Sequence, residues 1–279
     1  MHRDVLLVAE EGAAGHDPAG MLRALGHRVR AVGDADAALA LARSRQPALV
    51  FIGPTVRGGC PIALCGDLKL SHDTNPLPVV RVIPPSRRAP ALEVAADATL
   101  SRPGVRAEVA AAIARACDGR AEAAREGAIS DARWCLPSDP DALEAFHAQF
   151  ARWLAATGLN NFQLQQTGLA VRELAANAIE WGHAYQRERI VSVCARLDDE
   201  KVTVNVRDSG PGFNPRDVPH AARPGDPLTH LEIRAGRQMR EGGFGILMAS
   251  GLVDHLAYNE AGNEALAIKY LPQRRVLAS

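Results

Sequence analysis

The sequence predicts an α/β protein with two domains, and two patterns support this. In the first 118 residues, short apolar runs alternate with segments rich in alanine and leucine; the runs lie at residues 5–9, 29–32, 48–52, 79–83 and 98–100. From about residue 132, amphipathic helical patterns are followed by strands and by two glycine-rich turns. A chain of 279 residues, 47% of them hydrophobic, can fill two modest cores.

The N-terminal alternation predicts a parallel sheet with helices on both faces. The third apolar run lies in PALVFIGPTVRGG (residues 47–59), and the fifth is followed by SRPG (residues 101–104). On these segments, residues 3–118 resemble a two-component receiver domain of flavodoxin-like topology. The resemblance implies a signalling protein of the response-regulator type.

The phosphoacceptor position departs from the receiver pattern. A receiver carries a nucleophilic aspartate after its third strand, whereas this chain has Gly53 there. The acidic pair survives as Glu10-Glu11, Ile83-Pro84-Pro85 occupies the hydroxyl position, and Arg102-Pro103 replaces lysine-proline. Glycine has no side chain to phosphorylate, so we predict a pseudo-receiver used for docking or dimerisation. A remnant kept as a solubilising scaffold is the alternative.

The segment that joins the domains is helical in character. About 25 residues in one helix would span roughly 37 Å. Its apolar seam would pack on the receiver sheet or form a dimer contact; the seam is Val105, Val109, Ile113 and Ala116. Gly119 costs a helix about 1 kcal/mol relative to alanine, which favours a break or bend near Asp118-Gly119. We therefore expect a receiver-like domain at 1–118, a helical linker at 119–131 and a second domain at 132–279.

The second domain opens with a strand at residues 134–136. Ser138 to Asp141 matches a helix-capping pattern, and the helix that follows has one apolar face: Leu143, Phe146, Phe150, Trp153 and Leu154. His147 lies in this helix, where a histidine kinase would carry its phosphoacceptor. The residues after it, Ala148-Gln149-Phe150, do not match such an acceptor, which disfavours autophosphorylation.

Three later blocks describe a nucleotide pocket. ELAANAIEWGH (residues 173–183) puts Glu173 and Asn177 on one helix face, a pair suited to magnesium and water. VRDSGPGFN (residues 206–214) ends a strand at Asp208, where a carboxylate beside an open turn can accept from an amino group. EGGFG (residues 241–245) precedes a helical run, whose free backbone N–H groups suit phosphates. Together the blocks predict an ATP site.

In this order and spacing, the blocks resemble the N-box and two glycine boxes of the GHKL ATPase superfamily, and the anti-sigma-factor serine kinases are the most similar branch. Each block alone also fits an ordinary amphipathic helix or hairpin turn. The resemblance runs from about residue 132 to 271, includes a strand, turn and strand at the end, and implies the Bergerat α/β sandwich. It implies that Asn177 binds Mg2+, that Asp208 accepts from the adenine amino group and that Glu173 is the general base.

Further site residues follow from the same resemblance. The glycines of the first box would let the backbone approach adenine, and the second box would contact the phosphates: Gly210 and Gly212, then Gly243, Phe244 and Gly245. Residues 215–241 resemble the mobile ATP lid and include Arg234, Arg237 and Arg240. These arginines fit a solvated helix face equally well. His183 is placed to approach phosphate, although a helix-terminal histidine commonly interacts with the helix dipole.

Charge and cysteine content exclude several classes of function. Lys plus Arg and Asp plus Glu both count 32, so no net charge favours nucleic acid or acidic lipid. Apolar runs are too short to cross a bilayer and no signal peptide is evident, so we expect a cytoplasmic protein. The five cysteines show neither a disulfide framework nor a zinc site.

Two functions from different classes remain open. The first is an ATP- and Mg2+-dependent serine/threonine kinase that acts on a small partner protein resembling an anti-sigma antagonist or a sigma factor. The second is a switch that binds ATP and changes partners without turnover. Glu173 is the one residue that favours the kinase. The sequence leaves the partner and a homodimeric state undecided.

Overall fold

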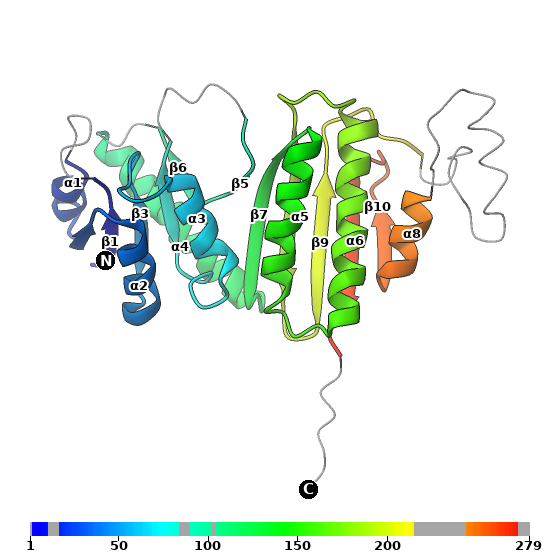
Figure 1. Cartoon of the computed structure of the whole chain (residues 1–279). Helices are drawn as coiled ribbons and strands as arrows, with labels where there is room; N and C mark the ends of the chain where they lie inside the picture. Colours follow the sequence, from blue (N-terminus) through cyan, green and yellow to red (C-terminus); the bar gives the residue numbers. More distant parts are fainter. Residues whose placement is uncertain (1, 11–16, 84–89, 102–103, 215–243, 273–279) are drawn as a thin grey trace, which may run out of the picture. The chain divides into compact units, whose positions relative to one another are not determined.

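The computed structural model describes residues 2–10, 17–83, 90–101, 104–214 and 244–272 (Figure 1). Two compact units divide the chain: Met1–Ala89 with Glu93–Ala132, and Pro90–Leu92 with Arg133–Ser279. Gly243, Arg234, Arg237 and Arg240, with the whole expected lid, lie outside the described residues. Within the described part of the chain, no helix combines the length and apolarity that a membrane span requires.

The first unit is a parallel sheet with helices on both faces. Its strand order is β2-β1-β3-β4-β6. The strands are β1 (Asp4–Val8), β2 (Arg28–Val32), β3 (Leu49–Ile52), β4 (Val79–Val82) and β6 (Ala98–Leu100). The helices are α1 (Pro18–Ala24), α2 (Ala35–Arg45), α3 (Pro61–Leu70) and α4 (Arg106–Arg125). One core cluster joins α1 and α4 to the sheet and another joins α2 and α3, which confirms the flavodoxin-like prediction.

The connection from β4 to β6 departs from the predicted alternation of strands and helices. Its described residues, 83 and 90–97, form only the two-residue strand β5 (Glu93–Val94). The Glu93 carboxylate lies 2.5 Å from the guanidinium of Arg81, a side chain that is buried in β4. A buried cation needs a paired carboxylate. This pairing holds the segment along the first unit, although its alanines favour a helix.

A break or bend was expected near Asp118-Gly119. Helix α4 runs without interruption through Gly119, so a break is absent. Alanine and other strong helix formers surround this single glycine, and together they outweigh its cost. Val109, Ile113 and Ala116 are buried in the first unit, while Val105 is 41% exposed. The seam of α4 therefore packs on its own sheet, which was one of the two expected uses.

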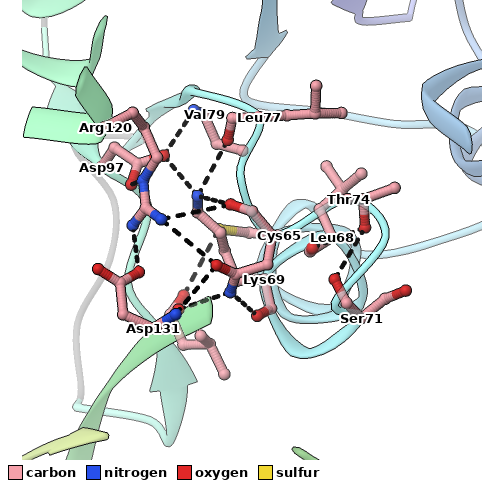
Figure 2. Close-up of polar contacts among 12 residues, drawn as sticks. Cys65, Leu68, Lys69, Ser71, Thr74, Leu77, Val79, Asp97, Arg120 and Asp131 are labelled. Carbon is pink, nitrogen blue, oxygen red and sulfur yellow. Dashed lines mark hydrogen bonds and ion pairs between the residues drawn. The ribbon is translucent and has the colours of Figure 1, made fainter. Parts of the chain in front are cut away.

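A buried polar cluster fixes the end of α4 (Figure 2). Arg120 lies 2.6 Å from one carboxylate oxygen of Asp97 and pairs with Asp131 as well. Lys69, which is buried, lies 2.7 Å from the other Asp97 oxygen. The side chain of Asn75 accepts from the backbone N–H of Asp131 at 3.1 Å. Residue 131, predicted to belong to a linker, is thus bonded to the first unit.

The second unit is an antiparallel sheet with helices packed on it. Its strands have the order β10-β11-β9-β8-β7. They are β7 (Ser130–Pro137), β8 (Ile190–Leu197), β9 (Lys201–Arg207), β10 (His255–Tyr258) and β11 (Glu264–Tyr270). The helices α5 (Pro140–Leu154), α6 (Asn161–Asn177) and α8 (Gly245–Leu252) cover one face of the sheet (Figure 1). This arrangement confirms the predicted sandwich.

The start of α5 differs in one detail from its prediction. The helix begins at Pro140, within the expected segment, but Asp139 caps it by accepting from the backbone N–H of Ala142 at 3.0 Å. Ser138 is fully buried and is not the cap. The apolar face of α5 is buried as predicted, and the ring of Trp134 meets three of its aromatic rings edge-on. Asp139 competes successfully for the cap because Pro140 already has a helix-compatible φ.

Candidate functional site

The N-box helix meets the second glycine box at Gly245. The N-box residues occupy α6 and a short π-helical turn, η2 (Ala178–Gly182), and α8 begins at Gly245. A Cβ atom at position 245 would lie 3.2 Å from Oε2 of Glu173 and 3.4 Å from Nδ2 of Asn177. Two blocks about 70 residues apart in sequence therefore form one cradle, and glycine keeps it open.

The cradle contains a buried amide without a partner. Within the described part of the chain, Nδ2 of Asn177 has no hydrogen-bond partner although the atom is buried. Such a group costs free energy unless a ligand or water satisfies it. Glu173 is held on its other side, since its Oε1 lies 3.6 Å from Arg172. These features fit the phosphate end of a nucleotide with Mg2+, because Nδ2 of Asn177 can donate to a phosphate oxygen, Oδ1 of the same carboxamide could ligate the metal, and Oε2 of Glu173 lies toward Gly245.

Asp208 lies at the end of β9, in a turn that folds onto itself. Its Oδ1 accepts from the backbone N–H of Gly210 at 2.6 Å. A Cβ at Gly210 would lie 2.2 Å from the carbonyl oxygen of Gly182, and one at Gly182 would lie 2.5 Å from the Asp208 carboxyl group. The end of the N-box and the first glycine box are therefore in direct contact. Gly210 is blocked by backbone and requires glycine, whereas a side chain at position 182 would have to displace the Asp208 carboxyl group.

The other glycine of the first box packs against the β10–β11 turn. Gly212 has a φ of +71° and Gly262 a φ of +73°. A Cβ at Gly212 would lie 1.8 Å from the carbonyl oxygen of Ala261, and one at Gly262 would lie 1.8 Å from that of Phe213. Gly212 thus has a structural role within the protein, beside the expected approach to adenine. Phe244, expected at the phosphates, is 40% exposed just before α8.

His183 lies at the end of the N-box, completely buried. Its Nδ1 is 2.6 Å from Oγ of Ser138, and its Nε2 accepts from the backbone N–H of Ser209 at 2.9 Å. Arg189 completes the group by donating to Oγ of Ser209 at 3.1 Å and to the carbonyl of Gly182 at 3.3 Å. Both ring nitrogens are engaged by the protein, so the ring acts on the turn beside Asp208 and not on a phosphate.

Burial is the main cause that lowers the pKa of His183, and the neighbouring Arg189 lowers it further, while Asp208 opposes the shift. The ring is therefore neutral above the usual histidine pKa near 6.5. After it, Ala184 and Tyr185 both adopt the left-handed region, with φ of 49° and 59°. Consecutive non-glycine residues in that region are uncommon. They turn the chain back so that Arg189 reaches the Ser209 turn.

Sequence reasoning did not identify Ser138, Gly182 or Arg189. The only signal for Gly182 was its place inside the N-box motif. Ser138 was attributed to a helix cap, and Arg189 stands between motifs. Their contacts span 7 to 51 positions of sequence, from Arg189 with the Gly182 carbonyl to the Ser138 hydroxyl that donates to the Arg189 carbonyl.

Residues 136–269 match the family model of the histidine kinase-like ATPase domain. The second unit carries a histidine kinase-like ATPase domain. This ATPase domain contains all the described blocks of the pocket, from Glu173 to Gly245. It follows a receiver-like unit, and the pair supports an ATP-binding signalling protein. The more specific relation to the anti-sigma-factor kinases is not part of this match. No curated protein sequence matches the chain significantly.

Several solved structures resemble parts of the chain. A putative response regulator from Chloroflexus aurantiacus J-10-fl is 16% identical, over 42% of this chain and 99% of that one, with a TM-score of 0.37. The receiver domain of the sensor histidine kinase PA1611 from Pseudomonas aeruginosa PAO1 is 18% identical, over 42% of this chain and 99% of that one, with a TM-score of 0.37. NtrX from Brucella abortus, solved with ATP, is 21% identical over 64% of this chain and 41% of its own, with a TM-score of 0.38. With these low TM-scores, the assignment of the receiver-like fold rests on strand order.

Proposed function

We propose that the chain is an ATP-dependent kinase that transfers the γ-phosphoryl group to a serine or threonine of a small protein partner. The observation that carries the proposal is the cradle at Gly245, where the Glu173 carboxylate and the unpartnered Asn177 amide converge. Phosphoryl transfer depends mainly on positioning and on neutralisation of charge. The resemblance of the three blocks to the anti-sigma-factor kinases supports the class of substrate.

Each residue has a distinct task in this proposal. Asp208 accepts from the adenine amino group through Oδ2, because Oδ1 is already bonded to the backbone N–H of Gly210. Asn177 holds Mg2+, which neutralises phosphate charge when bound. The N–H groups at the start of α8 face the phosphates. Glu173 orients the attacking hydroxyl and accepts its proton, while Arg172 keeps the carboxylate in place from the other side.

Two substitutions on α6 test the proposal in the full chain. Asn177→Ala removes the metal ligand, so calorimetry with Mg2+ and ATP should show at least a tenfold loss of affinity. Glu173→Ala should keep the affinity within a few-fold, while transfer of labelled phosphate to a co-purified protein falls about a hundredfold, the usual scale for a lost general base. Gln165→Ala is the control, because Gln165 is exposed on the same helix.

The alternative function gives a different result. A switch that binds ATP without turnover would show no acid-stable phosphoserine or phosphothreonine on any partner, and Glu173→Ala would exchange partners normally. Full transfer activity in Glu173→Ala would remove the general-base assignment. ATP affinity that is unchanged in Asn177→Ala would remove this residue from the metal site.

A further inference from the structure

His183 bonds to two segments that the nucleotide site needs in a fixed position. Through Nε2 it holds the backbone N–H of Ser209, the residue directly after Asp208. Through Nδ1 it is bonded to Ser138, at the end of β7, and the Ser138 hydroxyl lies 3.0 Å from the carbonyl of Arg189. The ring therefore ties the adenine-reading turn to a rigid strand end.

The contacts identify the protonation state that this geometry requires. Nε2 accepts a backbone N–H, so it carries no proton. The single ring proton lies on Nδ1 and is donated to Oγ of Ser138, whose own proton goes to the Arg189 carbonyl. Addition of a second proton would place an N–H on Nε2 directly opposite the N–H of Ser209. Two donors cannot share that bond, so protonation breaks it. The ring contact would then pass from the Ser209 N–H to the Ser209 hydroxyl, which lies 3.0 Å from Nε2, and this exchange shifts the turn.

We propose that His183 is a positioning residue whose neutral ring sets the Asp208 turn for adenine, and whose protonation lowers the affinity for nucleotide. The inference rests on the proposed function, because Asp208 must read adenine for the turn to matter. It extends that function by making nucleotide binding sensitive to acid. The deciding geometry is the 2.9 Å bond from Ser209 to Nε2 and the complete burial of the ring.

The surrounding charges set the direction of the effect. Two charged groups face the ring in the described part of the chain, Arg189 after η2 and Asp208 after β9. Burial and Arg189 lower the pKa of His183 below its usual value near 6.5, and Asp208 opposes them. The unfolded chain therefore binds this proton more readily, and stability from the neutral ring is complete above about pH 6.5 and declines as pH falls below it.

Two substitutions test the two hydrogen bonds of the His183 ring one at a time. Glutamine places an amide oxygen near the position of Nε2, so His183→Gln keeps an acceptor for Ser209 and cannot titrate. Asparagine reaches only as far as Nδ1, so His183→Asn keeps a partner for Ser138 and loses the bond to Ser209. We expect His183→Gln to retain ATP affinity within about threefold at pH 7.5, and His183→Asn to lose about tenfold or more.

The decisive experiment follows ATP affinity of the full chain from pH 7.5 to pH 4.5, beside the NMR titration of the His183 ring. At each pH, the wild-type affinity is divided by the affinity of His183→Gln, which removes the effect of the titration of the nucleotide itself. This ratio should fall as the protonated fraction of the ring rises. Exchange of the Ser209 amide, measured without nucleotide, should accelerate over the same range.

The possible outcomes distinguish the inference from the proposed function. If the protein binds ATP at pH 7.5 and the affinity ratio stays flat while the ring protonates, or if the ring stays neutral to pH 4.5, the acid sensitivity is refuted and the kinase proposal stands. If ATP does not bind at pH 7.5, the proposed function and the present inference fall together. Should neither variant fold, the wild-type ring titration and Ser209 exchange decide the question alone.

Discussion

Replacement of Gly210 by alanine tests whether the contact between the two motifs shapes the adenine end of the site. A Cβ at this position would lie 2.2 Å from the carbonyl oxygen of Gly182 and 2.6 Å from its Cα atom. Real Cβ contacts are essentially never shorter than 3.0 Å, so the turn must move by at least 0.8 Å, the difference between 3.0 Å and 2.2 Å. Both obstacles are backbone atoms and cannot rotate away.

The movement shifts Asp208 away from the position proposed for it beside the adenine base. A hydrogen bond to a charged group contributes about 1.5–3 kcal/mol, and 1.4 kcal/mol corresponds to a factor of ten. Gly210→Ala should therefore weaken ATP binding by about ten- to a hundredfold, measured by calorimetry with Mg2+ on the full chain. Guanine nucleotides, which lack the adenine amino group, should lose much less affinity.

A matched control is Gly251→Ala. Gly251 is exposed in α8, and a Cβ there meets no atom within 4 Å. This variant should keep ATP affinity within about twofold and melt at the same temperature or slightly higher. If Gly210→Ala, folded by circular dichroism, binds ATP as tightly as the Gly251→Ala protein, the contact between Gly182 and Gly210 does not shape the pocket.

Three further outcomes are expected. Asp208→Asn should weaken adenine nucleotides by about tenfold, because the new amide group presents donors to the adenine amino group; equal affinity in calorimetry would remove Asp208 from the site. Gly53→Asp should stay unmodified by small phosphodonors in intact-mass analysis, because a Cβ there would lie 2.8 Å from that of Ala9; an aspartyl phosphate would contradict this. Gly119→Ala should raise the free energy of unfolding by about 0.5–1 kcal/mol, since it meets no atom within 4 Å inside a helix; an unchanged or lower melting temperature would oppose that reasoning.

The sequence predicts what depends on short-range pattern. The apolar runs of the first unit became its parallel strands, and the apolar face of α5 is buried, because periodicity of hydrophobic residues decides which side faces a core. The same holds for the strands around Asp208 and for the start of α8. These features need only residues within about one element of each other.

Other features depend on partners that are distant in sequence. The alanines after β4 suggested a helix, but the buried Arg81 draws Glu93 to it. Gly119 suggested a break, which the rest of α4 overrides. Ser138 fitted a capping pattern, yet it lies next to His183 across 45 positions. Local propensity predicts secondary structure poorly where a buried charged or polar group must pair with one residue that is distant in sequence.

The two ends of the site differ in how the protein supports them. The proposed adenine end is held by contacts within the protein: Gly210 packs against Gly182, and Ser209 donates to His183. The proposed phosphate end contains the amide nitrogen of Asn177, which no described residue satisfies. Removal of an unsatisfied buried group can leave stability unchanged, whereas disruption of a packed turn lowers it. Asn177→Ala should therefore lose binding without a lower melting temperature, while Gly210→Ala should lose both. An Asn177→Ala protein that unfolds more readily would mean that the amide already has a structural role, and the argument that it awaits a ligand would fail.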